Sequence, residues 1–231
     1  MKKLQWAAGV ILGFSIIAAL LITSFEIAMY ADFDVYQREY EKYDVLSDLD
    51  MTMEDVMYVT HEMMDYLRGE GDTLSVMTTV EGKEQDFFNE QDRFHMAEVR
   101  TLFIGGLNIR LGACILAVLC LVFLIGTKAD IRRIIPRGYQ ISLLVTGAAV
   151  LVLGIACVVD FNAVFVQFHH IFFDNDLWIF DPAEDYMIRM LPEGLFYDMV
   201  VRIGTIFVVC LIVLLILSFI PKIVEKRKGL A

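Results

Sequence analysis

Residues 102–126 read LFIGGLNIRLGACILAVLCLVFLIG. This run is almost wholly apolar, and it is longer than the ~20 residues that an α-helix needs to cross the hydrocarbon core of a bilayer. Three further runs have the same character, at 4–29, 141–160 and 199–220. The pattern predicts an all-α membrane protein with four transmembrane helices.

The composition of the whole chain agrees with this prediction. Its mean hydropathy of +0.61 and its hydrophobic content of 58% are too high for an ordinary soluble domain. The first run follows Lys2 and Lys3, but it exceeds the ~7–15 apolar residues of a signal peptide and lacks a cleavage site, so we expect an uncleaved signal anchor. All four cysteines lie within apolar runs, where thiols behave as small hydrophobic groups.

Charge is distributed very unevenly along the chain. All but three of the 30 acidic residues lie in segments 30–101 and 160–198, whereas basic residues cluster at the N-terminus, in 127–140 and in 221–231. Because basic segments stay on the cytoplasmic side, both termini should be cytoplasmic and both acidic segments external. The net charge of −11 argues against a nucleic-acid partner.

The expected organisation follows from these boundaries. It comprises a first transmembrane helix at 1–29, an extracytoplasmic domain at 30–101, a second helix at 102–126, a basic cytoplasmic loop at 127–140, a third helix at 141–160, an aromatic and acidic interfacial segment at 161–198, a fourth helix at 199–220 and a basic cytoplasmic tail at 221–231. The extracytoplasmic domain should be mostly helical. Thr52 and Asn89 are typical N-caps, Gly69 is a typical helix end, and 74–80 could form a strand. Asp181 and Pro182 predict the start of a short helix.

Two polar stretches lie beside the spans. Residues 168–182 read FHHIFFDNDLWIFDP, and residues 93–100, directly before the second span, read RFHMAEVR. Aromatic rings gather at the headgroup layer, and histidines exchange protons near neutral pH. We interpret the two stretches as two halves of an active site at the membrane surface. Adjacent helical residues point about 100° apart, so we expect His169 to face the site and His170 to face headgroups or solvent. His61 should be a solvated surface residue.

Four charged residues fall inside the apolar runs. Glu26, Arg110, Asp160 and Arg202 lie roughly 24–33 Å above the cytoplasmic ends of their helices, in the outer part of a ~30 Å core. They could form a collar at the headgroups, or they could line a polar cavity together with Asn108. In either case the two arginines should pair with the two acids.

The two histidine stretches resemble the lipoprotein intramolecular transacylase (Lit) family of Gram-positive bacteria, and the similarity covers nearly the whole chain. Membership would imply moving the sn-2 acyl chain of a diacylglyceryl-cysteine lipoprotein to the α-amine of the same cysteine, giving lyso-form lipoprotein. The family's two functional histidines fall on His95 and His169. We expect supporting or substrate-binding roles for Arg93, Glu98, Asn108, Arg110, Asp160, Asn175, Asp176, Trp178 and Arg202. The partners would be the lipoprotein N-terminus and membrane lipid, with no metal or cofactor and with a monomeric enzyme.

The chemistry of such a transfer suits two histidines. Aminolysis of an ester needs a proton acceptor, a proton donor for the leaving alkoxide and stabilisation of an oxyanion. We expect His95 to act as base, oriented or charged by Glu98, and His169 as acid, with its pKa lowered by aromatic surroundings. The two environments should therefore push the pKa values apart. The sequence is equally compatible with a route through a covalent acyl-enzyme at His95.

Two alternatives belong to other classes of protein. A zinc hydrolase could use His95, Glu98, His169 and His170, but H-x-x-E is only half of a metal site and no H-E-x-x-H occurs. A non-enzymatic membrane sensor or chaperone could use the acidic outer domain to bind a partner. Insensitivity to chelators would dispose of the first, and loss of function in His95→Ala would argue against the second.

Overall fold

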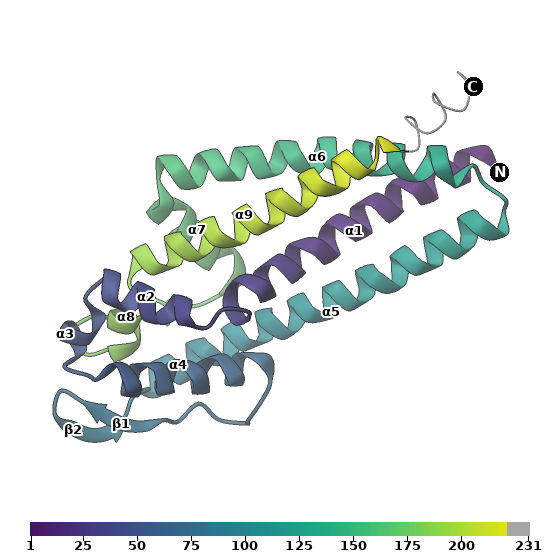
Figure 1. Cartoon of the computed structure of the whole chain (residues 1–231). Helices are drawn as coiled ribbons and strands as arrows, with labels where there is room; N and C mark the ends of the chain where they lie inside the picture. The colour runs from purple at the N-terminus through teal and green to yellow at the C-terminus, as the bar shows by residue number, and fades with distance from the viewer. Residues whose placement is uncertain (221–231) are drawn as a thin grey trace. The chain divides into compact units, whose positions relative to one another are not determined.

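The computed structural model describes residues 1–220 as a largely helical chain (Figure 1). Its elements are α1 (Lys2–Tyr30), α2 (Asp34–Lys42), α3 (Val45–Leu49), α4 (Met53–Arg68), β1 (Met77–Val80), β2 (Lys83–Asp86), α5 (Glu90–Gly126), α6 (Ile131–Val159), α7 (Phe161–Phe172), α8 (Tyr186–Met190) and α9 (Glu193–Leu217). Four of them, α1, α5, α6 and α9, are long and apolar enough to cross a membrane. The predicted class, an all-α membrane protein with four spans, is confirmed.

The helices extend beyond the apolar runs from which they were predicted. The second and fourth spans are the later parts of α5 and α9, which begin at Glu90 and Glu193. The segment predicted as a basic loop, 127–140, is mostly helical, because α6 begins at Ile131. Its arginines therefore lie on the first turns of a span. The predicted tail, 221–231, lies outside the described residues.

The chain divides into two compact units. The four-span unit comprises Met1–Ala28, Leu107–Val159 and the chain from Arg202 on, and the cap unit comprises Met29–Gly106 and Asp160–Val201. Helices α1, α5 and α9 contribute residues to both units. Each unit has its own apolar clusters.

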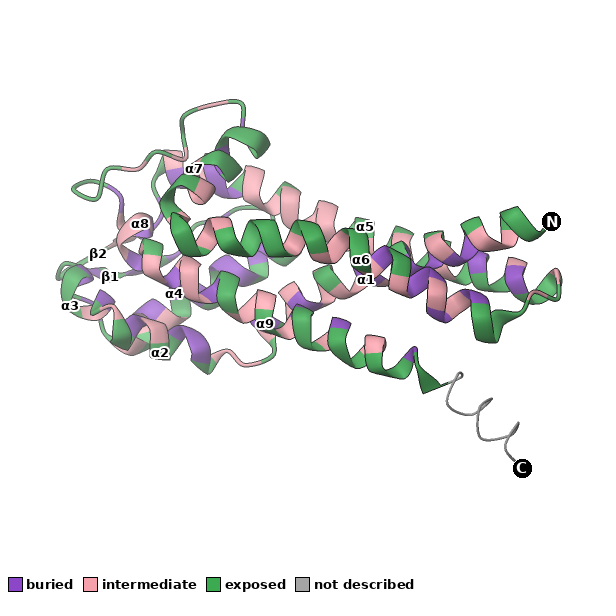
Figure 2. Ribbon diagram, turned by 90° about the horizontal axis from the view of Figure 1, so that it is seen from above, coloured by how far each residue is buried: buried purple, intermediate pink, exposed green. Residues whose placement is uncertain are grey.

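The four-span unit packs α1 closely against α6. Gly9 and Gly138 face each other so tightly that a Cβ on Gly138 would overlap the backbone of Gly9. The Ser142 hydroxyl, one turn further along α6, donates to the carbonyl oxygen of Val10 at 3.0 Å. Small residues and hydroxyl bonds of this kind let membrane helices approach where lipid supplies no hydrophobic driving force. Exposed residues run along the outer faces of the long helices, the pattern of surfaces made for lipid (Figure 2).

The cap unit confirms the predicted helix signals. The Thr52 hydroxyl accepts the Asp55 amide at 3.1 Å at the start of α4, and Gly69 ends that helix with φ +96°. Asn89 and Asp92 each accept the other's backbone amide at 2.9 Å, a reciprocal capping box before α5. The core is apolar and rich in aromatic and methionine side chains; its fully buried members include Tyr36, Tyr40, Met64, Phe87, Phe88 and Met190.

A β-hairpin in the cap unit was predicted only in part. The expected strand at 74–80 is shortened to β1, which pairs antiparallel with β2. The sequence of β2, KEQD, lacks the β-branched and aromatic residues that mark a strand, and neither of its first two residues is buried. Its pairing is set by β1 and the intervening turn at Glu81 and Gly82, both with positive φ.

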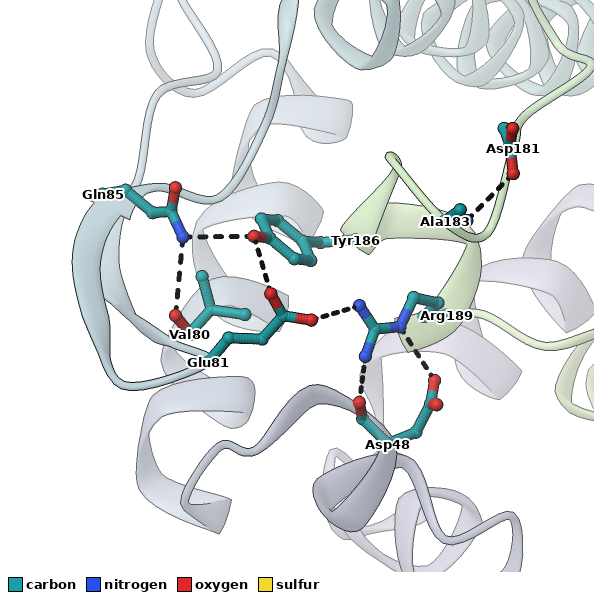
Figure 3. Close-up of polar contacts among 8 residues, drawn as sticks. All are labelled: Asp48, Val80, Glu81, Gln85, Asp181, Ala183, Tyr186 and Arg189. Carbon is teal, nitrogen blue, oxygen red and sulfur yellow. Dashed lines mark hydrogen bonds and ion pairs between the residues drawn. The ribbon is translucent and has the colours of Figure 1, made fainter.

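Arg189 on α8 joins three elements of the cap unit (Figure 3). Its guanidinium binds the Asp48 carboxylate at 3.0 Å and the Asp48 carbonyl on α3, and it binds Glu81 in the hairpin turn at 2.7 Å. The Tyr186 hydroxyl accepts from Gln85 at 3.2 Å. The predicted helix start at Asp181 and Pro182 is wrong: the Asp181 carboxylate instead accepts the Ala183 amide in a turn, and α8 begins at Tyr186.

Candidate active site

Two buried histidines face each other in the cap unit. The rings of His95 on α5 and His169 on α7 are stacked, with centroids 5.9 Å apart and planes 26° apart. Only 6% of His95 and 7% of His169 are exposed. A pair of imidazoles held this way is protected from bulk water yet close enough to act on one small group.

Local sequence signals place each histidine. The Asn89 capping box sets the start of α5, so His95 lies in its second turn, before the apolar run that begins at Leu102. Asp160 ends α6, and its carboxylate accepts the Ala163 amide at 2.9 Å to start α7. On α7, His169 is buried, whereas His170 is exposed and meets the edge of the Trp178 ring at 5.2 Å.

Aromatic rings enclose the pair. Phe173 and Phe180 meet His95 edge-on, with centroids at 4.9 and 5.5 Å. Trp178 stacks on His169 at 4.7 Å, and its indole N–H is buried with no acceptor among residues 1–220. Sequence reasoning named Phe173 as one of several rings around His169, but it did not place Phe173 or Phe180 against His95. Five of the residues in 168–182 are aromatic, and the pattern alone does not say which rings turn inward.

One hydrogen bond fixes the proton position on His169. Its Nδ1 lies 2.7 Å from the carbonyl oxygen of Phe165, one turn earlier on α7. A carbonyl oxygen can only accept, so Nδ1 carries the hydrogen and donates. The neutral ring therefore presents an unprotonated Nε2, which is a proton acceptor. The Nδ1 of His95 is buried and has no partner in the described part of the chain.

Burial lowers the pKa of both histidines. Desolvation, with a smaller contribution from His169, lowers the pKa of His95 to about 4, because an imidazolium loses its hydration there. Desolvation also lowers the pKa of His169, although the bond to Phe165 acts in the opposite direction. The expectation that Glu98 holds a charge on His95 is therefore wrong, because burial lowers the pKa of His95 as well as that of His169. Both rings are neutral at pH 7.

A strap, residues 174–185, runs beside the pair and is tied to the first turns of α5. The Asn175 amide donates to Glu98 at 2.8 Å. Gln91 donates to the carbonyl oxygens of Leu177 and Ile179 at 3.1 and 3.0 Å. Asn89 donates to the buried carboxylate of Asp185 at 2.5 Å. Because these tethers come from one helix, the strap and His95 are positioned together.

Three other predicted site residues of the cap unit have structural contacts or exposed positions. Arg93 pairs with Asp86 at 2.6 Å and donates to the Leu74 carbonyl, so it fixes the hairpin segment to α5. Asp176 is exposed on the strap. Asp160 uses its carboxylate as the cap of α7 rather than lying inside an apolar span.

The remaining predicted residues belong to the four-span unit. Arg110 forms the expected ion pair with Glu26. Arg202 is half-buried, and Asn108 is exposed. Within residues 1–220, no three histidine, cysteine, aspartate or glutamate side chains are grouped so as to hold a metal ion.

Comparisons with known proteins agree on one family. The profile of the family "Lipoprotein intramolecular transacylase Lit" matches residues 10–196. No curated protein sequence matches the chain. An in meso structure of the membrane integral lipoprotein intramolecular transacylase Lit from Bacillus cereus has a TM-score of 0.79 at 20% identity, over 100% of both chains. Structures of that protein with a histidine-to-alanine and a histidine-to-arginine mutation give TM-scores of 0.74 and 0.75, also at 20% identity; the matches cover 100% and 99% of this chain and 97% and 96% of theirs.

Proposed function

The chain belongs to the lipoprotein intramolecular transacylase (Lit) family, and on that premise we propose that it moves the sn-2 acyl chain of a diacylglyceryl-cysteine lipoprotein to the α-amine of the same cysteine. The protein is a membrane-integral transacylase that acts on lipoprotein substrates. This membership removes the sensor or chaperone alternative and argues against a hydrolase. The observation that carries the finer proposal is the buried His95–His169 pair.

The first proton step belongs to His169. The substrate amine starts as an ammonium of pKa ~7.7–8.0, and a neutral imidazole must remove its proton before the nitrogen can attack. The bond from Nδ1 to Phe165 leaves Nε2 of His169 free to accept. The transfer is uphill by about 2 kcal/mol or more, because the pKa of His169 lies below its usual value. This assignment reverses the one expected from the sequence.

The second proton step belongs to His95. The neutral amine attacks the carbonyl carbon of the ester, the C–N bond forms, and the carbonyl oxygen becomes an oxyanion. His95 accepts the second nitrogen proton and passes it to the glyceryl oxygen as the C–O bond breaks. The products are an amide and an alcohol, and the proton held by His169 returns to solvent. Because ester and amine belong to one molecule, proximity can supply part of the ~7–11 kcal/mol available to such reactions.

Membrane placement completes the proposal. The concentration of basic residues at the N-terminus and in segment 127–140, which joins α5 to the first turns of α6, supports cytoplasmic termini and a site at the outer leaflet. A diacylglyceryl group could then keep its chains in lipid while its ester reaches the histidines. The enzyme would work as a monomer without a metal or cofactor.

Mass spectrometry tests the reaction directly. When the protein is produced in a host that makes diacylated lipoproteins, we expect the N-terminal lipopeptide to keep its mass, because the transfer is internal. Fragmentation should place one acyl chain on the α-amine and leave one on the glyceryl group. Both chains remaining on the glyceryl group would contradict the proposal, and a chelator should leave the result unchanged.

Trp178 is the candidate donor for the oxyanion. Its ring stacks on His169, and its buried indole N–H has no acceptor among residues 1–220. A single oxyanion donor is commonly worth 10²–10³ in kcat. Trp178→Phe keeps the stacked ring but removes the N–H, so we expect kcat to fall by about 10²-fold with little change in KM. Trp6→Phe, at the chain's other tryptophan, is the matched control and should keep its activity. Equal activity in the two variants would refute this role.

A further inference from the structure

Only one of the two carboxylate oxygens of Glu98 has a hydrogen-bond partner in the described part of the chain. Its Oε1 accepts a hydrogen bond from the Asn175 amide at 2.8 Å. The oxygen of the same amide group accepts the backbone N–H of Leu177 at 2.9 Å, so both ends of the Asn175 amide are hydrogen-bonded. The second oxygen, Oε2, is buried and has no hydrogen-bond partner within residues 1–220.

The two arginines nearest to Glu98 on the same helix contact other residues. Arg93 pairs with Asp86 at 2.6 Å, and the guanidinium of Arg100 lies over the Tyr66 ring at 4.6 Å. Glu98 itself forms no ion pair in the described part of the chain, and its contact is with Asn175 rather than with His95. A desolvated carboxylate oxygen without a donor is unfavourable, and such a group needs an explanation. A cationic ligand would supply one.

Glu98 lies next to the histidines. It follows His95 by about one turn of α5, which is ~4.5 Å along the helix axis. Its partner Asn175 comes shortly after Phe173, whose ring contacts both His95 at 4.9 Å and His169 at 5.4 Å. The Oε2 atom of Glu98 therefore belongs to the same group of contacting residues as His95 and His169.

Resting on the transacylase reaction proposed above, we propose that Glu98, fixed by Asn175, binds the α-ammonium of the substrate's N-terminal cysteine. An ammonium has three N–H donors, so it can bind Oε2 with one and present another to the Nε2 of His169. The ester has no such group, so the contact orients the amine end of the substrate. The product nitrogen is an uncharged amide, which cannot form this ion pair. Glu98 thus distinguishes substrate from product.

A binding experiment without turnover tests this role. His169→Asn is purified in detergent micelles at pH 7 and titrated with two diacylglyceryl lipopeptides that differ only in an acetyl group on the α-amine. We expect the free amine to bind at least ~10-fold more tightly, as charge-assisted hydrogen bonds do. Adding Glu98→Gln should make the two lipopeptides bind alike. Glu90→Gln, an exposed acid at the start of the same helix, is the matched control and should keep the preference.

The possible outcomes separate the two proposals. The role of Glu98 is refuted if the variant with Glu98→Gln still prefers the free-amine lipopeptide, or if His169→Asn alone shows no such preference. Neither result bears on the proposed reaction. Failure of both lipopeptides to bind overturns the proposed function instead. If Glu98→Gln lowers the unfolding temperature, Asn175→Ala provides a second test, because it removes the hydrogen bond to Glu98 and keeps the carboxylate. It should reduce the preference several-fold, and an unchanged preference would again refute the inference.

Discussion

Replacing His169 by asparagine should abolish acyl transfer, with kcat lower by at least about 10³-fold. Asparagine is close in size to histidine, and its amide can still donate to the Phe165 carbonyl, but it has no nitrogen that accepts a proton. His95→Asn should be equally inactive, because its ring is the second acceptor in the proposed route. The measurement is the rate at which the amide-linked acyl chain appears on a lipopeptide.

The other two histidines provide controls for this experiment. His170 is exposed, and His61 stacks on Phe33 at 3.8 Å in an exposed position, so His170→Ala and His61→Ala should keep most of the activity. The pH profile gives a second readout. Burial lowers the pKa of His95 to about 4 and also lowers that of His169, so activity should be lost on the acid side at a pH below the ordinary value of a free histidine. Near-normal turnover in His169→Asn would exclude proton transfer by that residue.

The Gly138→Val variant should lose at least about 3 kcal/mol of stability. A Cβ at this position meets the backbone of Gly9 and Val10 on α1, and backbone atoms cannot move aside as a flexible side chain can. Helices α1 and α6 would have to separate, which also breaks the bond from Ser142 to Val10. Thermal unfolding in detergent micelles measures the loss.

A second glycine on α6 makes this prediction specific. Nothing lies within 4 Å of a Cβ built at Gly147, so Gly147→Val adds the same side chain to the same helix without a collision. Its unfolding temperature should stay close to that of the parent protein. If both variants unfolded alike, the effect would come from valine in the helix rather than from the contact between α1 and α6.

The fold was predictable wherever the signal is local or repeats along one element. Apolar runs long enough to span a bilayer are recognised by their length. The Thr52 and Asn89 caps and the Gly69 helix end each depend on a few neighbouring residues. Strand β2 was missed because its sequence, KEQD, has low strand propensity and it forms only by pairing with β1. The start of α8 was missed because its position depends on residues distant in the sequence. The Arg189 contacts to Asp48 and Glu81 illustrate this, since no spacing rule connects three such separated positions.

For the candidate site, the sequence indicated which histidines lie together, but it did not indicate their electrostatics. The resemblance to the Lit family singled out His95 and His169, and the 100° rotation between neighbours favoured His169 over His170. The relative basicity of the rings was not accessible, because it depends on which phenylalanines turn inward and on where Glu98 binds. The Phe165 carbonyl, which determines the tautomer of His169, carries no sequence signal at all, since every residue has one.

The strap has a consequence for how the enzyme is made. Its tethers join residues 77 to 96 positions apart in the chain. Contacts of such large sequence separation form late, because the intervening chain must first be closed into a loop. During synthesis, His95 emerges from the ribosome long before the strap that encloses it. With the site proposed above, a nascent chain that has inserted its first spans still lacks His169 and the strap, so we expect acyl transfer only after synthesis has proceeded as far as Asp185.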